Sequence, residues 1–106
     1  FAPASFDGKT FRYTVISGTD NMNTSGNFTI SFTGTTYYLV DSGGLDSGTY
    51  TYTKTGANMA TLVGNSSVDG DSATFTLSFT SPTSGSYSSV KTSGVPGTQT
   101  GTFIIN

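Results

Sequence analysis

Residues 71–80 read Asp71-Ser72-Ala73-Thr74-Phe75-Thr76-Leu77-Ser78-Phe79-Thr80, and apolar side chains alternate with hydroxyl side chains along this stretch. Successive side chains of an extended chain point to opposite faces. The alternation therefore predicts a β-strand with one buried face and one solvated face. Ala73, Phe75, Leu77 and Phe79 are expected on the buried face.

The same pattern occurs earlier in the chain, where residues 27–33 align with residues 74–80 at a constant offset of 47. Further on, residues 48–52 align with residues 101–105 at an offset of 53. One explanation is an internal duplication with halves of about 9–56 and 57–106. The other is that a Thr-rich β chain repeats itself by chance.

The composition favours an all-β domain. The chain has 106 residues, among them 21 Thr, 16 Ser and 14 Gly, which suit strands and turns, while the helix formers Glu, Lys, Arg and Gln are scarce or absent. This length is typical of a single domain, here 1–106, with residues 1–8 as a lead-in. No Cys is present, so disulfides are excluded.

Turn residues divide the chain into about eight short segments with the alternation of strands. We expect strands at residues 9–17, 27–33, 36–40, 49–54, 59–64, 71–80, 86–91 and 100–106, with residues 92–98 irregular. Short connections between successive strands predict an antiparallel up-and-down meander. Closure into a barrel is expected because it removes exposed edges, and a β-sandwich is the alternative.

The absence of His and Cys excludes a Ser-His-Asp triad, a Cys nucleophile and the usual zinc sites. All six Asp residues lie in or beside turns, where capping explains them. No pair of carboxylates is held on rigid elements, as a glycosidase would need. We therefore expect a protein without catalytic residues, cofactor or metal. Calcium at residues 20–23 or 69–71 is the weaker alternative, because neither stretch matches a calcium-loop pattern.

The charge pattern limits the partners. Four basic and six acidic residues give a net charge of −2, so a nucleic-acid partner, which needs a basic patch, is not expected. No apolar run is long enough to insert into a membrane. The chain begins at Phe1 rather than Met, which indicates a processed product or a piece of a longer protein. The Ser/Thr/Gly-rich composition is typical of an extracellular or cell-surface module.

Three stretches carry a resemblance to a known family: Gly8-Lys9-Thr10-Phe11-Arg12-Tyr13, residues 47–58 and Gly101-Thr102-Phe103. They resemble the small lipocalin-like (calycin-type) β-barrel domains of bacterial secreted proteins. The resemblance spans most of the chain and implies an eight-stranded up-and-down barrel. It implies no catalytic residue.

The tyrosines are the main candidates for a binding site. Tyr50 and Tyr52 share a face and are expected inside, whereas one of Tyr37 and Tyr38 must face outward. Inward rings can fill the barrel, or they can edge a cavity or a sugar-binding platform. Candidate ligand-binding residues are Arg12, Tyr13, Tyr37, Tyr38, Tyr50, Tyr52 and Tyr87.

Two functions are consistent with these features. The first is a non-catalytic extracellular or cell-surface module for structure, adhesion or assembly, with self-association as its expected interaction. The second is a lipocalin-like barrel that binds a small apolar or sugar-like ligand, such as a glycan, in its mouth.

Overall fold

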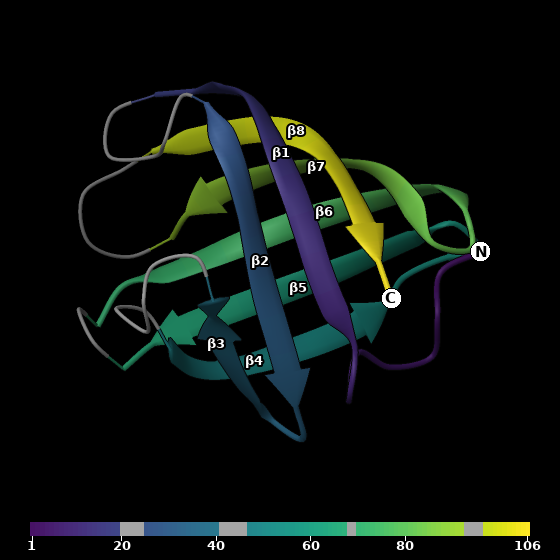
Figure 1. Ribbon diagram of the computed structural model, residues 1–106, viewed down its shortest axis with the longest axis horizontal. Coiled ribbons are helices and arrows are strands. Elements are labelled where there is room, and N and C mark those ends of the chain that lie inside the picture. Colours follow the sequence, from purple (N-terminus) through teal and green to yellow (C-terminus); the bar gives the residue numbers. More distant parts are fainter. Residues whose placement is uncertain (20–24, 41–46, 68–69, 93–96) are drawn as a thin grey trace.

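The computed structural model describes residues 1–19, 25–40, 47–67, 70–92 and 97–106. The strands are β1 (Thr10–Gly18), β2 (Gly26–Thr33), β3 (Thr36–Leu39), β4 (Ser47–Lys54), β5 (Met59–Ser66), β6 (Ser72–Ser81), β7 (Ser84–Lys91) and β8 (Thr98–Ile105). Each strand pairs antiparallel with the next, and β8 pairs with β1, so the sheet closes into a barrel (Figure 1). The predicted up-and-down barrel is confirmed, and the sandwich alternative is wrong.

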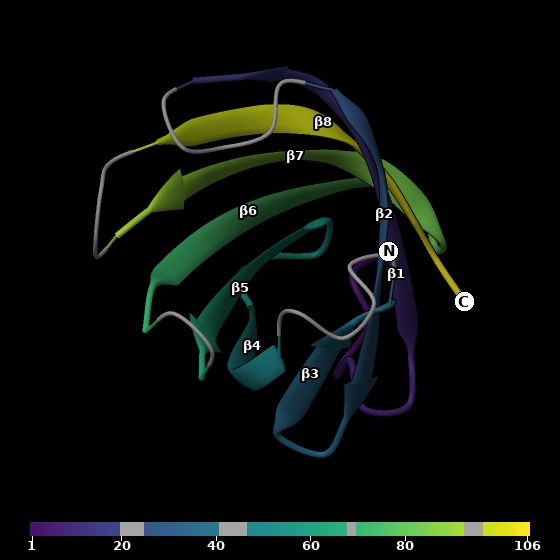
Figure 2. The same ribbon diagram turned by 60° about the vertical axis from the view of Figure 1, so that its left-hand side comes forward.

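The barrel is strongly twisted. In Figure 1, β1 and β2 run across β4, β5 and β6 at a steep angle, and Figure 2 shows the sheet curving from β8 through β7, β6 and β5 to β4. Such crossing is expected because strands twist and must tilt for a sheet to close. The hairpins β2–β3, β4–β5 and β6–β7 lie at the same end of the barrel as the lead-in segment, residues 1–8.

The inward and outward faces follow the predicted alternation. On β1, Phe11, Tyr13 and Val15 are buried, whereas the side chains between them are exposed. On β6, Leu77 and Phe79 are buried and their outward neighbours are exposed or half-buried. The two-residue period of the sequence therefore locates the core correctly.

Aromatic rings from several strands meet inside the barrel. The ring centroid of Phe11 on β1 lies 5.2 Å from that of Phe103 on β8, 6.3 Å from that of Phe75 on β6 and 6.5 Å from that of Phe32 on β2. Tilted and edge-to-face arrangements dominate the cluster, as expected for rings that pack through their quadrupoles. This cluster joins strands that are far apart in the sequence.

Two predicted boundaries are wrong near the C-terminal half. The expected strands 71–80 and 86–91 leave residues 81–85 between them. In the structure β6 continues to Ser81 and β7 already begins at Ser84. Gly85 belongs inside β7 because the Phe103 ring covers it, and a Cβ there would lie 2.9 Å from Phe103 Cζ. Thr98 was expected in an irregular segment, but it begins β8 and pairs with Val90.

The repeated pattern maps onto β2 and β6, which are separated by three strands in either direction around the barrel. Gly48 and Gly101, aligned by the second repeat, also have similar surroundings. A Cβ at either position would overlap a backbone carbonyl of the next strand, that of Asn65 or that of Thr14. The duplication of 9–56 and 57–106 stays a prediction.

Within the part of the chain that the structure describes, no helix is long and apolar enough to cross a membrane.

Candidate functional site

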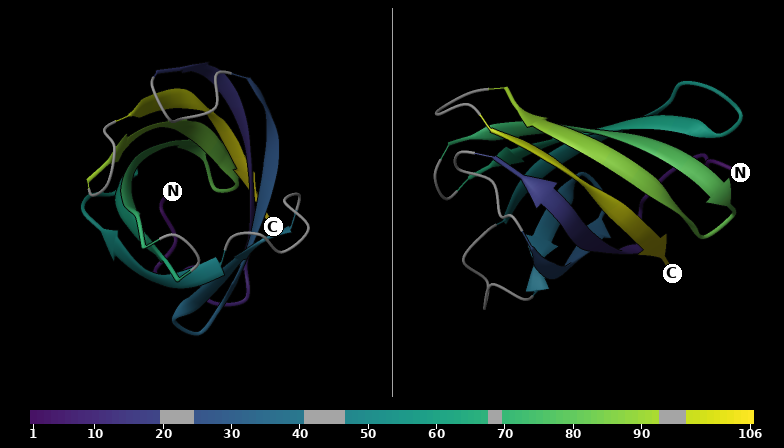
Figure 3. Two further views of the ribbon diagram at one scale, coloured as in Figure 1. Left: turned by 90° about the vertical axis from the view of Figure 1, so that its left-hand side faces the viewer. Right: turned by 90° about the horizontal axis from the view of Figure 1, so that it is seen from above.

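The lead-in segment, residues 1–8, closes one end of the barrel. Its path crosses the ring of strands, which is visible in the end-on view of Figure 3. Phe6 is fully buried, and its ring stacks on Tyr52 with centroids 4.4 Å apart. Rings of Phe32 and Phe11 lie 5.3 and 6.0 Å away. Phe6 therefore belongs to the core although it precedes the first strand.

Hydrogen bonds hold the lead-in segment at both its ends. The Ala2 amide donates to Ala57 O at 3.0 Å, and the Tyr52 hydroxyl donates to Pro3 O at 2.7 Å. Near β1, the Gly8 amide donates to Phe32 O at 3.0 Å. Gly8 has φ of 76°, a conformation that glycine adopts at little cost, and this turn directs the chain into β1.

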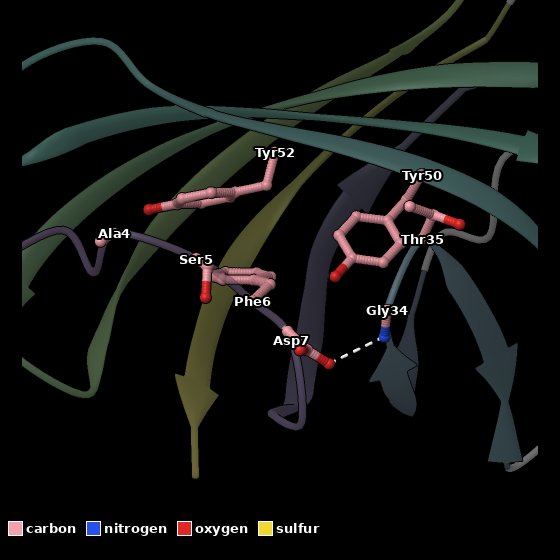
Figure 4. A pocket seen from close by; sticks show the side chains of 8 residues that line it. All are labelled: Ala4, Ser5, Phe6, Asp7, Gly34, Thr35, Tyr50 and Tyr52. Carbon is pink, nitrogen blue, oxygen red and sulfur yellow. Dashed lines mark hydrogen bonds between the residues drawn. The ribbon is translucent and has the colours of Figure 1, made fainter.

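A pocket of about 200 Å³ lies between the lead-in segment, β4 and the β2–β3 hairpin (Figure 4). The residues that line it are Ala4, Ser5, Phe6, Asp7, Gly34, Thr35, Tyr50 and Tyr52. In Figure 4 the ring of Tyr50 stands beside the stacked pair Phe6–Tyr52, and its hydroxyl points toward Asp7. The pocket therefore has aromatic walls and a polar edge.

Asp7 forms the polar edge. Its Oδ1 accepts a hydrogen bond from the Gly34 amide at 2.8 Å, which ties the lead-in segment to the β2–β3 hairpin. Among the described side chains the only ion pair joins Lys91 to Asp71, so no described cation neutralises Asp7. No group within the described ranges accepts a hydrogen bond from the Tyr50 hydroxyl. A carboxylate oxygen and a phenol thus face the pocket.

Both pocket tyrosines are held in their neutral form. Burial raises the pKa of Tyr52 to about 12. Burial, and to a lesser extent the negative charge of Asp7, raises the pKa of Tyr50. Near neutral pH these hydroxyls are therefore hydrogen-bond donors, and neither is suited to act as a base.

The structure brings two of the predicted site residues together and separates the others. Tyr50 and Tyr52 line the pocket. Tyr37 is half-buried and would be 3.6 Å from a Cβ at Gly64, on the inner face of β5. The remaining predicted residues fall into two groups that do not line this pocket: Tyr13 and Tyr87 are buried in the core, whereas Arg12 and Tyr38 are exposed on the outer surface.

A second set of polar groups lies elsewhere in the core. The Tyr87 hydroxyl donates to Gln99 Oε1 at 2.9 Å, and both residues are buried. Ser89 pairs directly with Gln99 across β7 and β8, and its hydroxyl is buried without a hydrogen-bond partner among the described residues. Burial raises the pKa of Tyr87 as well. An unpaired buried hydroxyl costs about 1–3 kcal/mol, so this region is less well satisfied than the aromatic core.

Asp7, Phe6, Gly34 and Thr35 were not among the predicted site residues. The Asp7 carboxylate accepts its hydrogen bond from the Gly34 amide of a distant hairpin, whereas the sequence predicted that it caps its own turn. Asp71 forms an ion pair with Lys91 at 2.8 Å. The other four Asp residues lie outside the described residues; they include Asp20 of the first candidate calcium stretch, 20–23, which lies wholly outside them, and Asp69 of the second.

Comparison with known proteins yields no match: no family model fits the chain, and neither a curated protein nor a solved structure matches it. The function is therefore inferred from the chemistry of the pocket.

Alkaline unfolding tests the environment of the buried tyrosines. A phenol whose pKa is raised by folding stabilises the fold fully below its unfolded pKa of about 10, and this contribution is lost as pH rises through the folded pKa. For Tyr52 the window runs from about pH 10 to about 12. We expect the free energy of unfolding, measured in urea, to fall across that window. The free energy of unfolding of Tyr52→Phe should fall less steeply with pH, whereas that of Tyr38→Phe should fall as in the wild type. Equal slopes for all three proteins would contradict this prediction.

Proposed function

We propose that this chain is a non-catalytic β-barrel module that acts outside the cell or at its surface, in adhesion, by holding one sugar-like unit in the pocket at its closed end. One observation carries the proposal: a ring-sized pocket combines the aromatic rings of Tyr50 and Tyr52, the latter stacked on the buried Phe6, with a carboxylate, that of Asp7, which no described cation neutralises. Binding sites for small ligands typically combine apolar and aromatic walls with a few polar groups.

The size of the pocket limits the ligand. Its volume of about 200 Å³ is below the roughly 300–1,000 Å³ of typical small-molecule sites. A cavity of about 150 Å³ can hold one benzene ring, so this pocket suits a single six-membered ring. A long apolar chain would not fit. This size allows either a small apolar ring or a sugar unit, and the polar edge of the pocket favours the sugar unit.

The polar groups of the pocket match the hydroxyls of a sugar. The Tyr50 phenol can donate a hydrogen bond, and the second oxygen of Asp7 can accept one, while Oδ1 is occupied by the Gly34 amide. A ring placed against Tyr50 would present its apolar face to the aromatic wall and its hydroxyls to these groups. The polar groups of the pocket and of the sugar would then have hydrogen-bond partners after water is displaced.

The same residues support a non-catalytic role. Hydrolysis of a glycoside needs two carboxyl groups on either side of the bond, and the residues that line the pocket contain one, that of Asp7. The tyrosines keep their protons because their pKa values are raised. The lining thus offers groups for recognition, without the second carboxyl group that glycosidase chemistry would need.

Assembly through an apolar outer face is less well supported. The exposed apolar side chains on the strands are flanked by polar cross-strand neighbours. Ile104 lies between Arg12 and Ser84, and Tyr38 between Ser31 and Ser47. Isolated apolar residues of this kind are normal on a monomer, whereas an interface needs a contiguous patch.

The proposed location and family rest on features of the sequence. A surface rich in Thr and Ser, with few charges, supports an extracellular or cell-surface location. The resemblance to lipocalin-like barrel domains of bacterial secreted proteins supports the same location, and the closed antiparallel barrel is compatible with that type.

Saturation-transfer NMR with a panel of methyl hexopyranosides tests the proposal. We expect at least one glycoside to bind with its ring protons against the protein. Tyr50→Ala should weaken binding about tenfold, equivalent to about 1.4 kcal/mol, because the aromatic wall is lost. Tyr38→Ala removes a tyrosine from the outer face of β3 and should bind as the wild type does.

Thermal unfolding of both variants must accompany the titration, and Tyr50→Phe provides a variant that keeps the ring. If no glycoside binds, or if Tyr50→Ala binds as well as Tyr38→Ala, the pocket is not the binding site.

A further inference from the structure

We infer that the pocket prefers a sugar ring that carries a protonated amino group over a neutral or acidic sugar. This inference rests on the proposed function and concerns the class of ligand within the same pocket. It depends on the charge of Asp7 and on the aromatic faces that surround it.

Among the described residues, Asp7 is the only charged one that lines the pocket. The Gly34 amide occupies one of its oxygens, and the one ion pair among the described residues, Lys91–Asp71, involves neither oxygen. A ligand that covers Asp7 displaces water from its carboxylate. This is costly unless the ligand restores the lost hydrogen bonds and compensates the negative charge. A ligand hydroxyl restores only the hydrogen bond, whereas an ammonium group restores the hydrogen bond and also compensates the negative charge.

The aromatic walls favour the same group. The partly exposed rings of Tyr50 and Tyr52 line the pocket together with Asp7 (Figure 4). The faces of aromatic rings carry partial negative charge and attract a cation within about 6 Å of the ring centre. A carboxylate beside aromatic faces is thus a favourable setting for an ammonium group on a ring-shaped ligand.

Electrostatics also excludes the opposite class of ligand. The negative charge of Asp7 reaches into the pocket, since it contributes to the raised pKa of the Tyr50 phenol. A sugar carboxylate placed there would meet a like charge with no described cation to compensate it. Uronic acids should therefore bind more weakly than neutral sugars.

Three ligands of matched shape test the inference on the full chain: methyl glucoside, methyl 2-amino-2-deoxyglucoside and methyl glucuronide. At low salt and about pH 6, where the amine is protonated, we expect the amino glycoside to bind at least about threefold tighter than the neutral one. Asp7→Asn should remove this preference while keeping an oxygen for the Gly34 amide. Asp71→Asn changes the net charge equally but does not line the pocket, so it should keep the preference.

Salt provides a second readout that needs no variant. Raising the salt to about 1 M should reduce the preference for the amino glycoside, because screening acts on charge pairs and spares stacking. Equal affinities for the amino and neutral glycosides, or a preference that survives Asp7→Asn, would overturn the inference and leave the proposed function standing. If none of the three glycosides binds, the proposed function fails and the inference fails with it.

Discussion

Phe6→Ala is expected to lower the free energy of unfolding by about 3–5 kcal/mol, as for other buried phenylalanines. Phe6 is fully buried, stacks on Tyr52 and contacts Phe32 and Phe11. Its removal would leave a cavity in the core and unpack the closed end of the barrel. Urea denaturation, with the slope compared between variants, measures the loss.

Phe1→Ala is the matched control, since Phe1 belongs to the same segment and its side chain is 58% exposed. It should change stability by no more than about 0.5 kcal/mol, as for most surface substitutions. If Phe6→Ala were equally mild, the lead-in segment would not close the barrel in solution.

Gly101→Ala is expected to cause a loss of similar size, about 3 kcal/mol, or failure to fold. A Cβ at this position would overlap the carbonyl oxygen of Thr14 and lie 2.8 Å from Tyr87 Cε1. Gly101 lies on β8 opposite Val15 of β1, at the pairing that closes the barrel. Overpacking typically costs about 1–3 kcal/mol, and here a backbone atom would have to move as well.

Gly56→Ala tests whether the effect depends on the position. A Cβ at Gly56 would meet its nearest atom, Met59 Cβ, at 3.7 Å, which is ordinary contact. We expect circular dichroism and thermal unfolding of this variant to match the wild type within about 0.5 kcal/mol. Near-native stability of Gly101→Ala would show that β1 and β8 do not pair as described.

The strands were predictable because their signal is local. The alternation in residues 71–80 assigned the inner face of β6 correctly, and the gap expected between the strands 27–33 and 36–40 is a real turn. Closure of the barrel was predicted from short connections and the need to protect edges, and the pairing of β1 with β8 confirms it. An error arose at Gly85, which was left between the expected strands 71–80 and 86–91, because the Phe103 ring that covers it comes from another strand.

The pocket was only partly predictable. Tyr50 and Tyr52 were expected inside, since they share a face of one strand, and both line the pocket. Phe6 lies in a short segment with Pro3 and no alternation, so no local signal indicated that it enters the core. The hydrogen bond between Asp7 and Gly34 joins residues 27 positions apart, and sequence patterns do not encode such a contact.

The buried polar groups of the core were also missed. Ser89 and Gln99 lie at inward positions of strands, where the rule of alternation gives the direction of a side chain but not its polarity. Tyr87 partners Gln99 across β7 and β8, a pairing that depends on the register of the barrel. Tertiary register therefore decides which hydroxyls are satisfied.

The most direct test of the central claim is a ¹H–¹⁵N NMR titration of the full chain with methyl 2-amino-2-deoxyglucoside, the glycoside expected to bind best. The proposed function predicts saturable shifts that concentrate on the amides of residues 5–7, of Gly34 and Thr35, and of β4 near Tyr50. Shifts confined to the outer strand faces, or no saturable shift with this or the neutral glycoside, would contradict a sugar site at the closed end of the barrel.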